Sequence, residues 1–406
     1  MKGSHPMSST TQASEVVIVG GGIYGTSLAY QLASAGRSVT LLEAGEIASG
    51  ASGGPGERGV RANGRDFREL PVCALSLELW KHYQETFEGG VGYRRIGGIK
   101  VFDVPYGHRE HEVRGRMEAM AAAQSSLGAP SEIWSREETL SREPELASGI
   151  IGAVHCPNDG VGDHTFATRQ FAREAAKAGA TIRTGAKVVE ILHARGAATG
   201  VKLASGEVVP VGDKLVVVAN AGAQDLLKPI FRPHEFSPVW NLMPQMLYVT
   251  NPLNKTVNHL LSHAHRRLAV KQIPDGTLML SGGAHVAHTP DGLWKGSLSA
   301  LTQNITDAIM TFPFIDSSSF LKADASRVET VAADVIPLIG QTEALSNTLY
   351  GYAWSGHGFA ISLGFTKLFT DWILTGTKPE ALEPFSPARF HQPAAALATS
   401  VVSRAA

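Results

Sequence analysis

Several features that would point to particular classes of protein are scarce in this 406-residue sequence. It has only two cysteines, which argues against a disulfide framework and against a cysteine-rich metal site. Its 36 basic and 37 acidic residues nearly cancel, so charge gives no reason to expect nucleic acid or an anionic membrane as a partner. No apolar run approaches the roughly 18 residues of a transmembrane helix, and no signal-peptide pattern is readable. We therefore expect a cytoplasmic protein without a transmembrane segment.

Glycine, in contrast, is abundant, and the stretch VVIVGGGIYGTSLAYQL concentrates it at one point. The continuous apolar run over residues 16–19 predicts a strand buried on both faces of a parallel sheet. Gly20, Gly22 and Gly25 then fit the pattern G-x-G-x-x-G, and apolar residues at helical spacing follow. A second apolar segment ends at Glu43, which lies 23 residues after Gly20. Strand, glycines, helix, strand and acid therefore occur in the order of a dinucleotide site.

Each residue of this motif has a physical role to which its type is suited. Gly20 allows the tight turn, Gly22 allows the backbone to approach a pyrophosphate, and Gly25 allows close packing of helix on strand. The start of the helix presents unpaired N–H groups and a partial positive charge to the phosphates. Glu43 is expected to accept hydrogen bonds from ribose hydroxyls. The motif by itself leaves open whether the dinucleotide is FAD or NAD.

The chain is long for a single core, so we expect two domains. Residues 1–14 read as a disordered leader and residues 391–406 as a tail. A loop with seven glycines over residues 45–64 is expected to lie over the cofactor. Hairpins are predicted over residues 93–104 and at two Gly-containing turns, Ser205-Gly206 and Asp275-Gly276.

Two later segments, TVAADVIPLIG and YAWSGHGFAISLG, resemble the D-amino acid oxidase superfamily when taken with the N-terminal motif and the strand VVVANAGA. Monomeric sarcosine oxidase, glycine oxidase and D-amino acid dehydrogenase are the members the chain is most similar to. The resemblance covers residues 15–385 and implies an α/β fold, with a Rossmann-like FAD-binding domain interleaved with a β-rich (α+β) substrate domain. The implied FAD-binding domain is discontinuous and comprises residues 15–90, 145–235 and 328–390. The implied substrate domain comprises residues 91–144 and 236–327.

The resemblance implies FAD as the cofactor and assigns residues to it. The cofactor-binding residues that we predict are Gly20, Gly22, Ile23, Tyr24, Gly25, Glu43, Ala44, Ser49, Gly50, Ser52, Arg58, Val188, Ala219, Gly222, Gly356, His357, Gly358 and Phe359. In this family the glycine-rich turn at residues 356–359 precedes a helix whose N-terminus faces the flavin pyrimidine.

Departures from the family pattern matter as much as the matches. Arg327 occupies the position of the cysteine that tethers flavin in monomeric sarcosine oxidase, so FAD is expected to be non-covalent. Glu329 replaces the arginine that clamps the substrate carboxylate in glycine oxidase relatives, and Ala360 replaces the lysine of sarcosine oxidase. Arg61, which with Arg58 resembles an arginine pair near the flavin, is then the remaining candidate for a carboxylate anchor.

The family's oxygen-activating lysine is also absent from its usual strand. Met279 stands there, and Lys271 lies eight residues earlier on the expected partner strand. The final electron acceptor is therefore left open between O2 and a quinone or protein. His259, His263 and His265 lie close in sequence, but without a carboxylate at ligand spacing we expect no metal.

The predicted activity is FAD-dependent oxidation of a primary or secondary amine, of the N-methyl or D-amino acid type, to an imine that then hydrolyses. Arg61, Glu329 and His357 are the predicted catalytic residues. Glu329 is expected either to pair with Arg327 or to face the substrate. Three alternatives stay open: a subunit of a heteromeric enzyme that relays electrons to a partner, a flavoprotein acting on a cationic amine without a carboxylate, and an NAD-linked reductase. The sequence leaves the oligomeric state open.

Overall fold

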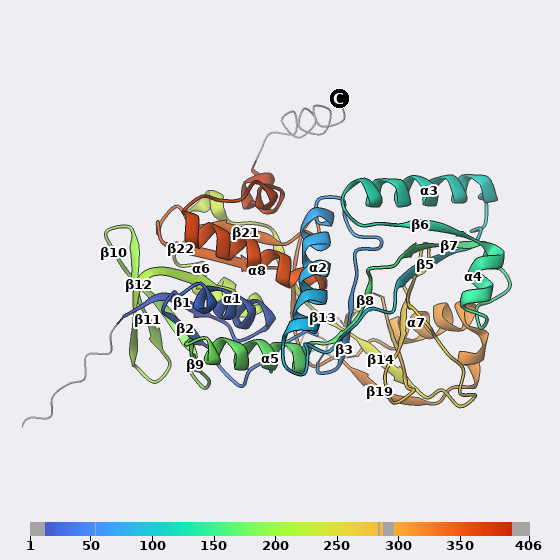
Figure 1. Ribbon diagram of the computed structural model, residues 1–406, viewed down its shortest axis with the longest axis horizontal. Coiled ribbons are helices and arrows are strands. Elements are labelled where there is room, and N and C mark those ends of the chain that lie inside the picture. Colours follow the sequence, from blue (N-terminus) through green and yellow to red (C-terminus); the bar gives the residue numbers. More distant parts are fainter. Residues whose placement is uncertain (1–12, 53, 283–284, 287–295, 392–406) are drawn as a thin grey trace, which may run out of the picture.

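The structure is a computed structural model that describes residues 13–52, 54–282, 285–286 and 296–391. Two large β-sheets lie towards opposite ends of its long axis, and the helix α2 (Leu70–Thr86) lies between them in Figure 1. The predicted leader falls almost entirely outside the described residues, as does nearly all of the predicted tail. The mixed α/β class that we expected is confirmed.

The first sheet has eight strands and is parallel around its first strand. β1 (Ser14–Val19) pairs in parallel with β2 (Val39–Leu42) and with β12 (Val208–Val217). Residues 16–19 are buried, as the apolar run predicts for a strand covered on both faces. The other strands of this sheet are β9 (Thr181–Arg183), β10 (Val188–Ala194), β11 (Ala197–Leu203), β21 (Leu338–Gln341) and β22 (Thr348–Tyr352).

Helices cover this sheet because its strands are apolar on both faces. α1 (Ile23–Ser34) packs against α5 (His164–Lys177) and α8 (Gly358–Thr375), and α8 packs against α2. α1 and α8 are largely buried, which explains why both are apolar around most of their circumference. The starts of α1 and α8, far apart in the sequence, are thereby brought into one region.

The second large sheet is built mainly from residues of the predicted substrate domain. Its order is β19-β14-β17-β16-β15-β5-β7-β6. The strands are β5 (Gly98–Phe102), β6 (Glu132–Ser135), β7 (Gly152–Cys156), β14 (Met246–Val249), β15 (Leu260–His263), β16 (Ala269–Gln272), β17 (Leu278–Ser281) and β19 (Phe320–Asp324). One face packs on α7 (Leu298–Thr311) and on the 3-10 helix η3 (Pro313–Ser317) through an apolar cluster.

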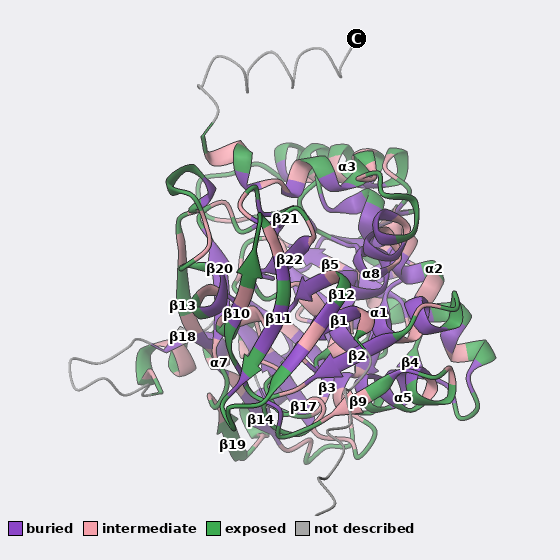
Figure 2. Ribbon diagram, turned by 90° about the vertical axis from the view of Figure 1, so that its left-hand side faces the viewer, coloured by how far each residue is buried: buried purple, intermediate pink, exposed green. Residues whose placement is uncertain are grey.

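Two three-stranded sheets and short helices complete the described fold. Their strands are β3 (Glu57–Val60), β4 (Tyr93–Arg94) and β8 (Gly160–Asp163) in one sheet, and β13 (Val239–Pro244), β18 (His285–Val286) and β20 (Glu329–Ala332) in the other. The remaining helices are α3 (Glu110–Ser126), α4 (Arg136–Arg142) and α6 (Ala223–Leu227), with 3-10 turns η1 (Asn220–Gly222), η2 (Pro233–Glu235), η4 (Glu380–Phe385) and η5 (Pro387–Phe390). α3 buries few of its residues and lies mostly at the surface (Figure 2).

The hairpins at Ser205-Gly206 and Asp275-Gly276 are confirmed, since β11 pairs with β12 and β16 with β17 in antiparallel register. The hairpin predicted over residues 93–104 is wrong. β4 pairs with β8 and β5 pairs with β7 and β15, so the two strands belong to different sheets. The Gly97-Gly98 step lets the chain pass from one sheet to the other rather than fold back. β7 also joins the second sheet, although the expected boundary at residue 145 assigns it to the cofactor domain.

Candidate active site

The glycine motif forms a closely packed turn between β1 and α1. A Cβ atom on Gly25 would lie 1.8 Å from the carbonyl oxygen of Gly20, so only glycine fits there. Gly20 itself has a φ of +117° and lies against Val218 and Ala219 at the end of β12. Gly22 differs, because a Cβ atom there would meet nothing within 4 Å. Gly22 therefore faces open space at the start of α1, where a phosphate could approach.

Glu43 lies at the end of β2 and is held by backbone groups of two loops. One carboxylate oxygen accepts from the Gly21 N–H at 2.6 Å, and the other accepts from the Gly45 N–H at 2.8 Å. Each oxygen keeps a free acceptor direction. The carboxylate is thus oriented in advance at the point where a dinucleotide ribose would lie beside the glycine turn.

The second glycine-rich turn is tied to the first by Tyr24. Its hydroxyl donates to the Gly358 carbonyl oxygen at 2.7 Å, and its ring stacks on Trp354 with centroids 3.6 Å apart. Gly358 begins α8, and a Cβ atom on it would collide with Trp354. Tyr24, which we predicted to contact the cofactor, is a buried residue whose contacts fix the starts of α1 and α8 relative to each other.

Glu329 lies at the start of β20 and joins three loops that we predicted to bind the cofactor. Its carboxylate accepts from the Ser52 hydroxyl and, at 3.5 Å, from the Asn220 side-chain amide. The backbone N–H groups of Gly356 and Ser355 also face it. Burial raises the pKa of Glu329, and these donors partly counter that shift. Arg327 bonds to the Ser49 carbonyl oxygen at 2.7 Å and pairs with no described carboxylate, so of the two alternatives for Glu329, the pair with Arg327 is wrong.

His357 precedes α8, and its ring lies beside a buried carboxylate. Its Nδ1 lies 3.3 Å from a carboxylate oxygen of Glu69, a fully buried residue at the start of α2. Burial, together with the nearby Arg65, lowers the pKa of His357. A carboxylate can only accept, so Nδ1 is the donor to Glu69, and in the neutral ring Nε2 is then the acceptor. Glu69 and Arg65 were not identified from the sequence.

Arg61 follows β3 on a loop that the second sheet holds firmly. The buried carboxylate of Asp159 accepts from the Ala62 N–H at 2.7 Å and from the Asn63 N–H at 3.2 Å. The Asn63 side chain in turn donates to the Val154 carbonyl oxygen at 2.8 Å. Burial, followed by the neighbouring Arg65, lowers the pKa of Arg61 to about 10. Arg61 is therefore a pre-positioned guanidinium that has no ion pair with any described carboxylate.

Arg58, the other predicted arginine, has a different role. Its guanidinium donates to carbonyl oxygens of its own loop: Ser52 at 3.2 Å, Glu57 at 2.9 Å and Gly54. These bonds use most of its donors, so Arg58 holds the loop that carries Ser52. A cavity of about 450 Å³ next to this loop is lined in part by Lys322, Asp324 and Ser326.

The face of the second sheet opposite the apolar cluster carries two further cations. Lys271 on β16 stands directly across from Met279 on β17, as the sequence predicts. The residue is only 4% exposed, and burial followed by the neighbouring Arg58 lowers its pKa to about 7. Lys100 on β5 points to the same face, because Ile99 and Val101 enter the apolar cluster. A lysine between two apolar strand residues was the sequence signal that could have identified Lys100.

The other predicted cofactor residues lie around the same region. Ser49 and Gly50 are exposed on the loop after β2, and Ala48 bonds back to the Gly21 carbonyl oxygen at 3.2 Å. Val188 begins β10 two residues after Ala186, whose N–H donates to the Glu43 carbonyl oxygen. Ile23 lies at the start of α1, and Ala44 is exposed beside Glu43. Gly222 lies in the turn after β12, and the ring of Phe359 contacts Trp80.

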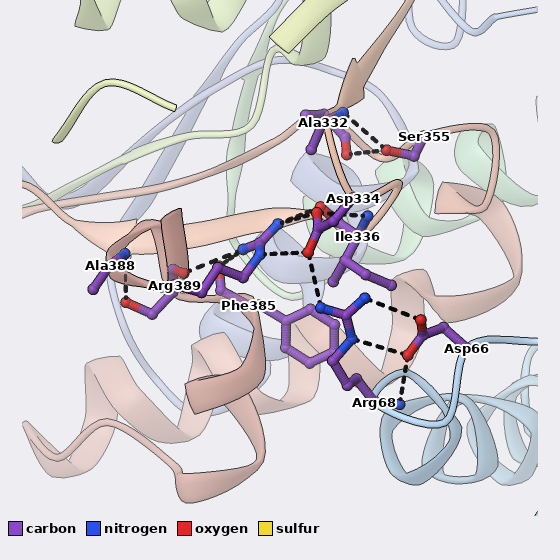
Figure 3. Close-up of polar contacts among 11 residues, drawn as sticks. Asp66, Arg68, Ala332, Asp334, Ile336, Ser355, Phe385, Ala388 and Arg389 are labelled. Atoms are coloured by element: carbon purple, nitrogen blue, oxygen red, sulfur yellow. Dashed lines mark hydrogen bonds and ion pairs between the residues drawn. The ribbon is translucent and has the colours of Figure 1, made fainter. Parts of the chain in front are cut away.

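The segment TVAADVIP is linked to the loop after Arg61 by ion pairs of its residue Asp334. Asp334 accepts two bonds from Arg389 at 2.9 Å each and one from Arg68 at 2.8 Å (Figure 3). Arg68 also binds Asp66 in the loop after Arg61. The network joins the C-terminal part of the described chain to the loops on both sides of the site.

The three histidines that invite a metal interpretation do not act together. His259 binds Glu143 through Nδ1 at 2.7 Å, whereas His263 accepts from backbone N–H groups of its own turn. Within residues 13–52, 54–282, 285–286 and 296–391, no group of three metal-ligating side chains occurs. In the same residues, no helix is both long and apolar enough to cross a membrane.

Fold and site together define a dinucleotide-binding protein, with a nucleotide cradle on a parallel sheet and a cationic site against a second sheet. The chain belongs to the FAD dependent oxidoreductase (DAO) family, whose model matches residues 15–372. The cofactor is accordingly FAD. The open space at Gly22, the oriented Glu43 and the turn at Gly358 fit this group.

Individual relatives are similar over nearly the whole chain. Rat (Rattus norvegicus) dimethylglycine dehydrogenase is 25% identical over 93% of this chain and 45% of its own length. The chain thus spans about half the length of the dimethylglycine dehydrogenases it matches. The beta subunit of sarcosine oxidase from an Arthrobacter species is 24% identical over 93% of this chain and 91% of its own length. The crystal structure of L-proline dehydrogenase from P. horikoshii superposes with a TM-score of 0.81, at 25% identity, covering 93% of this chain and 98% of that one.

Proposed function

We propose that the chain oxidises the carbon–nitrogen bond of an amino acid, of the N-methyl or D-amino acid type, to an imine. The observation that carries this proposal is Arg61, a half-buried guanidinium on a firmly held loop with no ion pair to a described carboxylate. A planar guanidinium binds a carboxylate through two parallel hydrogen bonds. The names of relatives, dimethylglycine dehydrogenase and D-amino acid dehydrogenase, support a substrate of this class.

The residues of the chain would bind and orient the substrate. When bound, FAD supplies the hydride acceptor for the carbon next to the amine nitrogen. Arg61 would hold the substrate carboxylate and so limit the directions in which the amine can lie. His357, neutral with Nε2 free to accept, could receive a proton from an ammonium group, so that the amine reacts in its neutral form.

Glu329 is proposed as a positioning residue at the flavin, because it holds Ser52, Asn220 and the Gly356 turn together. We also propose that FAD is bound without a covalent bond. Arg327 stands at the tether position, and Cys73 is buried with its thiol pKa raised to about 12 by burial. Precipitation with acid should release the flavin into the supernatant, whereas a yellow pellet would contradict the proposal.

A panel of amines tests the activity. The FAD-loaded protein is mixed anaerobically with N-methyl amino acids, D-amino acids, L-proline and amines without a carboxylate, and loss of flavin absorbance is followed. Bleaching by amino acids but not by their decarboxylated analogues supports the proposal. Bleaching only by amines without a carboxylate would instead favour a cationic substrate held by Glu329.

A second candidate is favoured by the match to a sarcosine oxidase subunit. In this case the chain would be one subunit of a larger enzyme that passes electrons to a partner protein. Isolation of the chain from its source cells with a tag would recover a fixed partner if this is correct. The acceptor, O2 or a quinone or protein, is tested by the rate at which the reduced protein reoxidises in air. The cytoplasmic location stays a prediction of the sequence.

A further inference from the structure

Lys100 is a cation without a counterion at the centre of the second sheet. It alternates with Ile99 and Val101, which pack in the apolar cluster, so its side chain points to the opposite face, where Lys271 also lies. Its Nζ makes no hydrogen bond or ion pair with the described part of the chain. The positive charge of Arg61 lowers the pKa of Lys100, and Lys100 in turn contributes to lowering the pKa of His263 on β15.

Lys100 and Arg61 converge on the same short loop. The Arg61 guanidinium donates to the Asn63 carbonyl oxygen. Gly64, the next residue, lies on the lysine: a Cβ atom there would be 2.3 Å from Cε and 2.8 Å from Nζ of Lys100. Gly64 has a φ of +71°, and its N–H donates to the buried Gln124 side chain at 2.6 Å. The loop is thus fixed in a shape that leaves space for the lysine.

Neighbouring positive charges destabilise a folded protein. Burial, followed by the positive charge of Arg61, lowers the pKa of Lys100 to about 8. Asp159, whose charge raises the pKa of Arg61, already accepts from two backbone N–H groups. Such an arrangement is retained where a ligand supplies the missing negative charge, because sites are often built at the expense of stability.

We infer that Lys100 is a second carboxylate-binding residue of the site, and that its ammonium group and the Arg61 guanidinium share the carboxylate of one substrate molecule. This inference rests on the proposed function. Arg61 contributes two parallel bonds that set the orientation of the carboxylate, and Lys100 contributes a point charge from the neighbouring sheet. The substrate class is then an amino acid with a free carboxylate, and its amides, esters and decarboxylated analogues are excluded.

Binding of acetate and of its neutral analogue acetamide to the FAD-loaded protein tests the inference. Each is followed through the change in flavin absorption, at constant ionic strength. Lys100→Met should weaken acetate binding about 10- to 100-fold, the range of one charged hydrogen bond, and leave acetamide unchanged. Lys100→Arg should restore most of the affinity. Lys202→Met, which removes an exposed strand lysine from the first sheet, is the matched control. It should change neither the affinity for acetate nor the affinity for acetamide.

Two further readouts separate a shared site from a general effect of charge. In the wild type, acetate affinity should fall as pH rises through about 8, where Lys100 loses its proton, and this step should be absent from Lys100→Met. The effects of Arg61→Ala and Lys100→Met should also be non-additive in the double variant, because both residues hold one carboxylate.

The outcomes distinguish failure of the inference from failure of the proposed function. If Lys100→Met binds acetate like the wild type while Arg61→Ala does not, Lys100 lies outside the carboxylate site and the proposed function stands. Additive effects of the two changes would overturn the shared site. If no amino acid bleaches the flavin and acetate does not perturb it, the proposed function fails and the inference fails with it. Loss of folding is not expected, because Lys100→Met removes a destabilising charge.

Discussion

The two sides of the candidate site differ in how they treat buried charge. On the side of the parallel sheet, the carboxylates of Glu43 and Glu329 are bound by donors of the chain itself, mostly backbone N–H groups. On the side of the second sheet, Lys100 and Lys271 have no partner among the described residues, and Arg61 has only backbone contacts. The comparison teaches that the chain itself supplies hydrogen-bond donors to the acidic groups beside the glycine turns, whereas the cations of the second sheet and of the Arg61 loop have no ion pair among the described residues.

The largest effect is expected at the glycine turn of the cofactor side. Gly25→Ala places a Cβ atom 1.8 Å from the Gly20 carbonyl oxygen, so β1 and α1 must move apart. We expect loss of FAD binding and a fall of about 3 kcal/mol in the free energy of unfolding, the upper range of overpacking. Flavin content and denaturant unfolding measure the two effects.

Gly22→Ala is the matched control for this change. Its Cβ atom meets nothing within 4 Å, so the free energy of unfolding of the apoprotein should stay within about 0.5 kcal/mol of wild type while FAD affinity falls. Equal unfolding free energies for the two variants would show that close packing at Gly25 is not required.

A large effect on activity is expected at Arg61. Loss of one partner of a buried charged pair costs about 3–5 kcal/mol, so Arg61→Ala should lower kcat/KM for an amino-acid substrate by about two to three orders of magnitude. Arg61→Lys should recover part of this, because lysine keeps the charge but lacks the planar fork. Steady-state kinetics with the best substrate of the panel measure both.

Glu329→Gln is the complementary variant in the same assay. If the substrate is a cationic amine, Glu329→Gln is the more damaging change and Arg61→Ala is nearly silent. An unchanged kcat/KM of Arg61→Ala with a carboxylate substrate would contradict the proposal that Arg61 binds the substrate carboxylate.

An effect of the opposite sign is expected at Lys271. Burial and Arg58 lower its pKa from 10.5 to about 7, so the unfolded chain binds more protons than the folded chain between these values. Stability from this group therefore rises with pH from about 7 to about 10.5. Lys271→Met should remove that rise and stabilise the ligand-free protein at pH 7 by about 1–4 kcal/mol. Unfolding curves of the wild type and of Lys271→Met at pH 6, 8 and 10 measure this effect. If the two proteins show the same pH dependence of stability, Lys271 has a partner in solution.

The smallest effect is expected at Glu43. Glu43→Ala removes an acceptor that faces the ribose, which is remote from the reacting end of the flavin. FAD affinity should fall by about 1–3 kcal/mol, and turnover of the flavin-loaded variant should change little. Titration of the apoprotein with FAD, followed by kinetics at saturating FAD, measures both. Unchanged affinity would refute the ribose role.

The cofactor side could be predicted from the sequence because its determinants are local. The run over residues 16–19, the spacing of Gly20, Gly22 and Gly25, and Glu43 all lie within one strand-helix-strand unit. Backbone geometry makes such a unit depend on glycine at fixed positions, so the pattern is visible without any long-range contact. Even in this region, the sequence did not predict the hydrogen bond from Tyr24 to Gly358, because it joins residues 334 positions apart.

The sequence by itself therefore determined the family, the cofactor and the glycine turns, whereas only the tertiary structure decided which buried charges are paired. Of the two alternatives that the sequence left open for Glu329, the pair with Arg327 is wrong, because Arg327 bonds to the Ser49 carbonyl oxygen and Glu329 to Ser52. The role proposed for Lys100 depends on the placement of β5, which lies in the second sheet rather than beside β4 and brings Lys100 against Gly64 in the loop after Arg61. The physical reason is that periodicity encodes which residues are buried, while the neutralisation of a buried charge depends on groups brought close by sheet register and loop contacts.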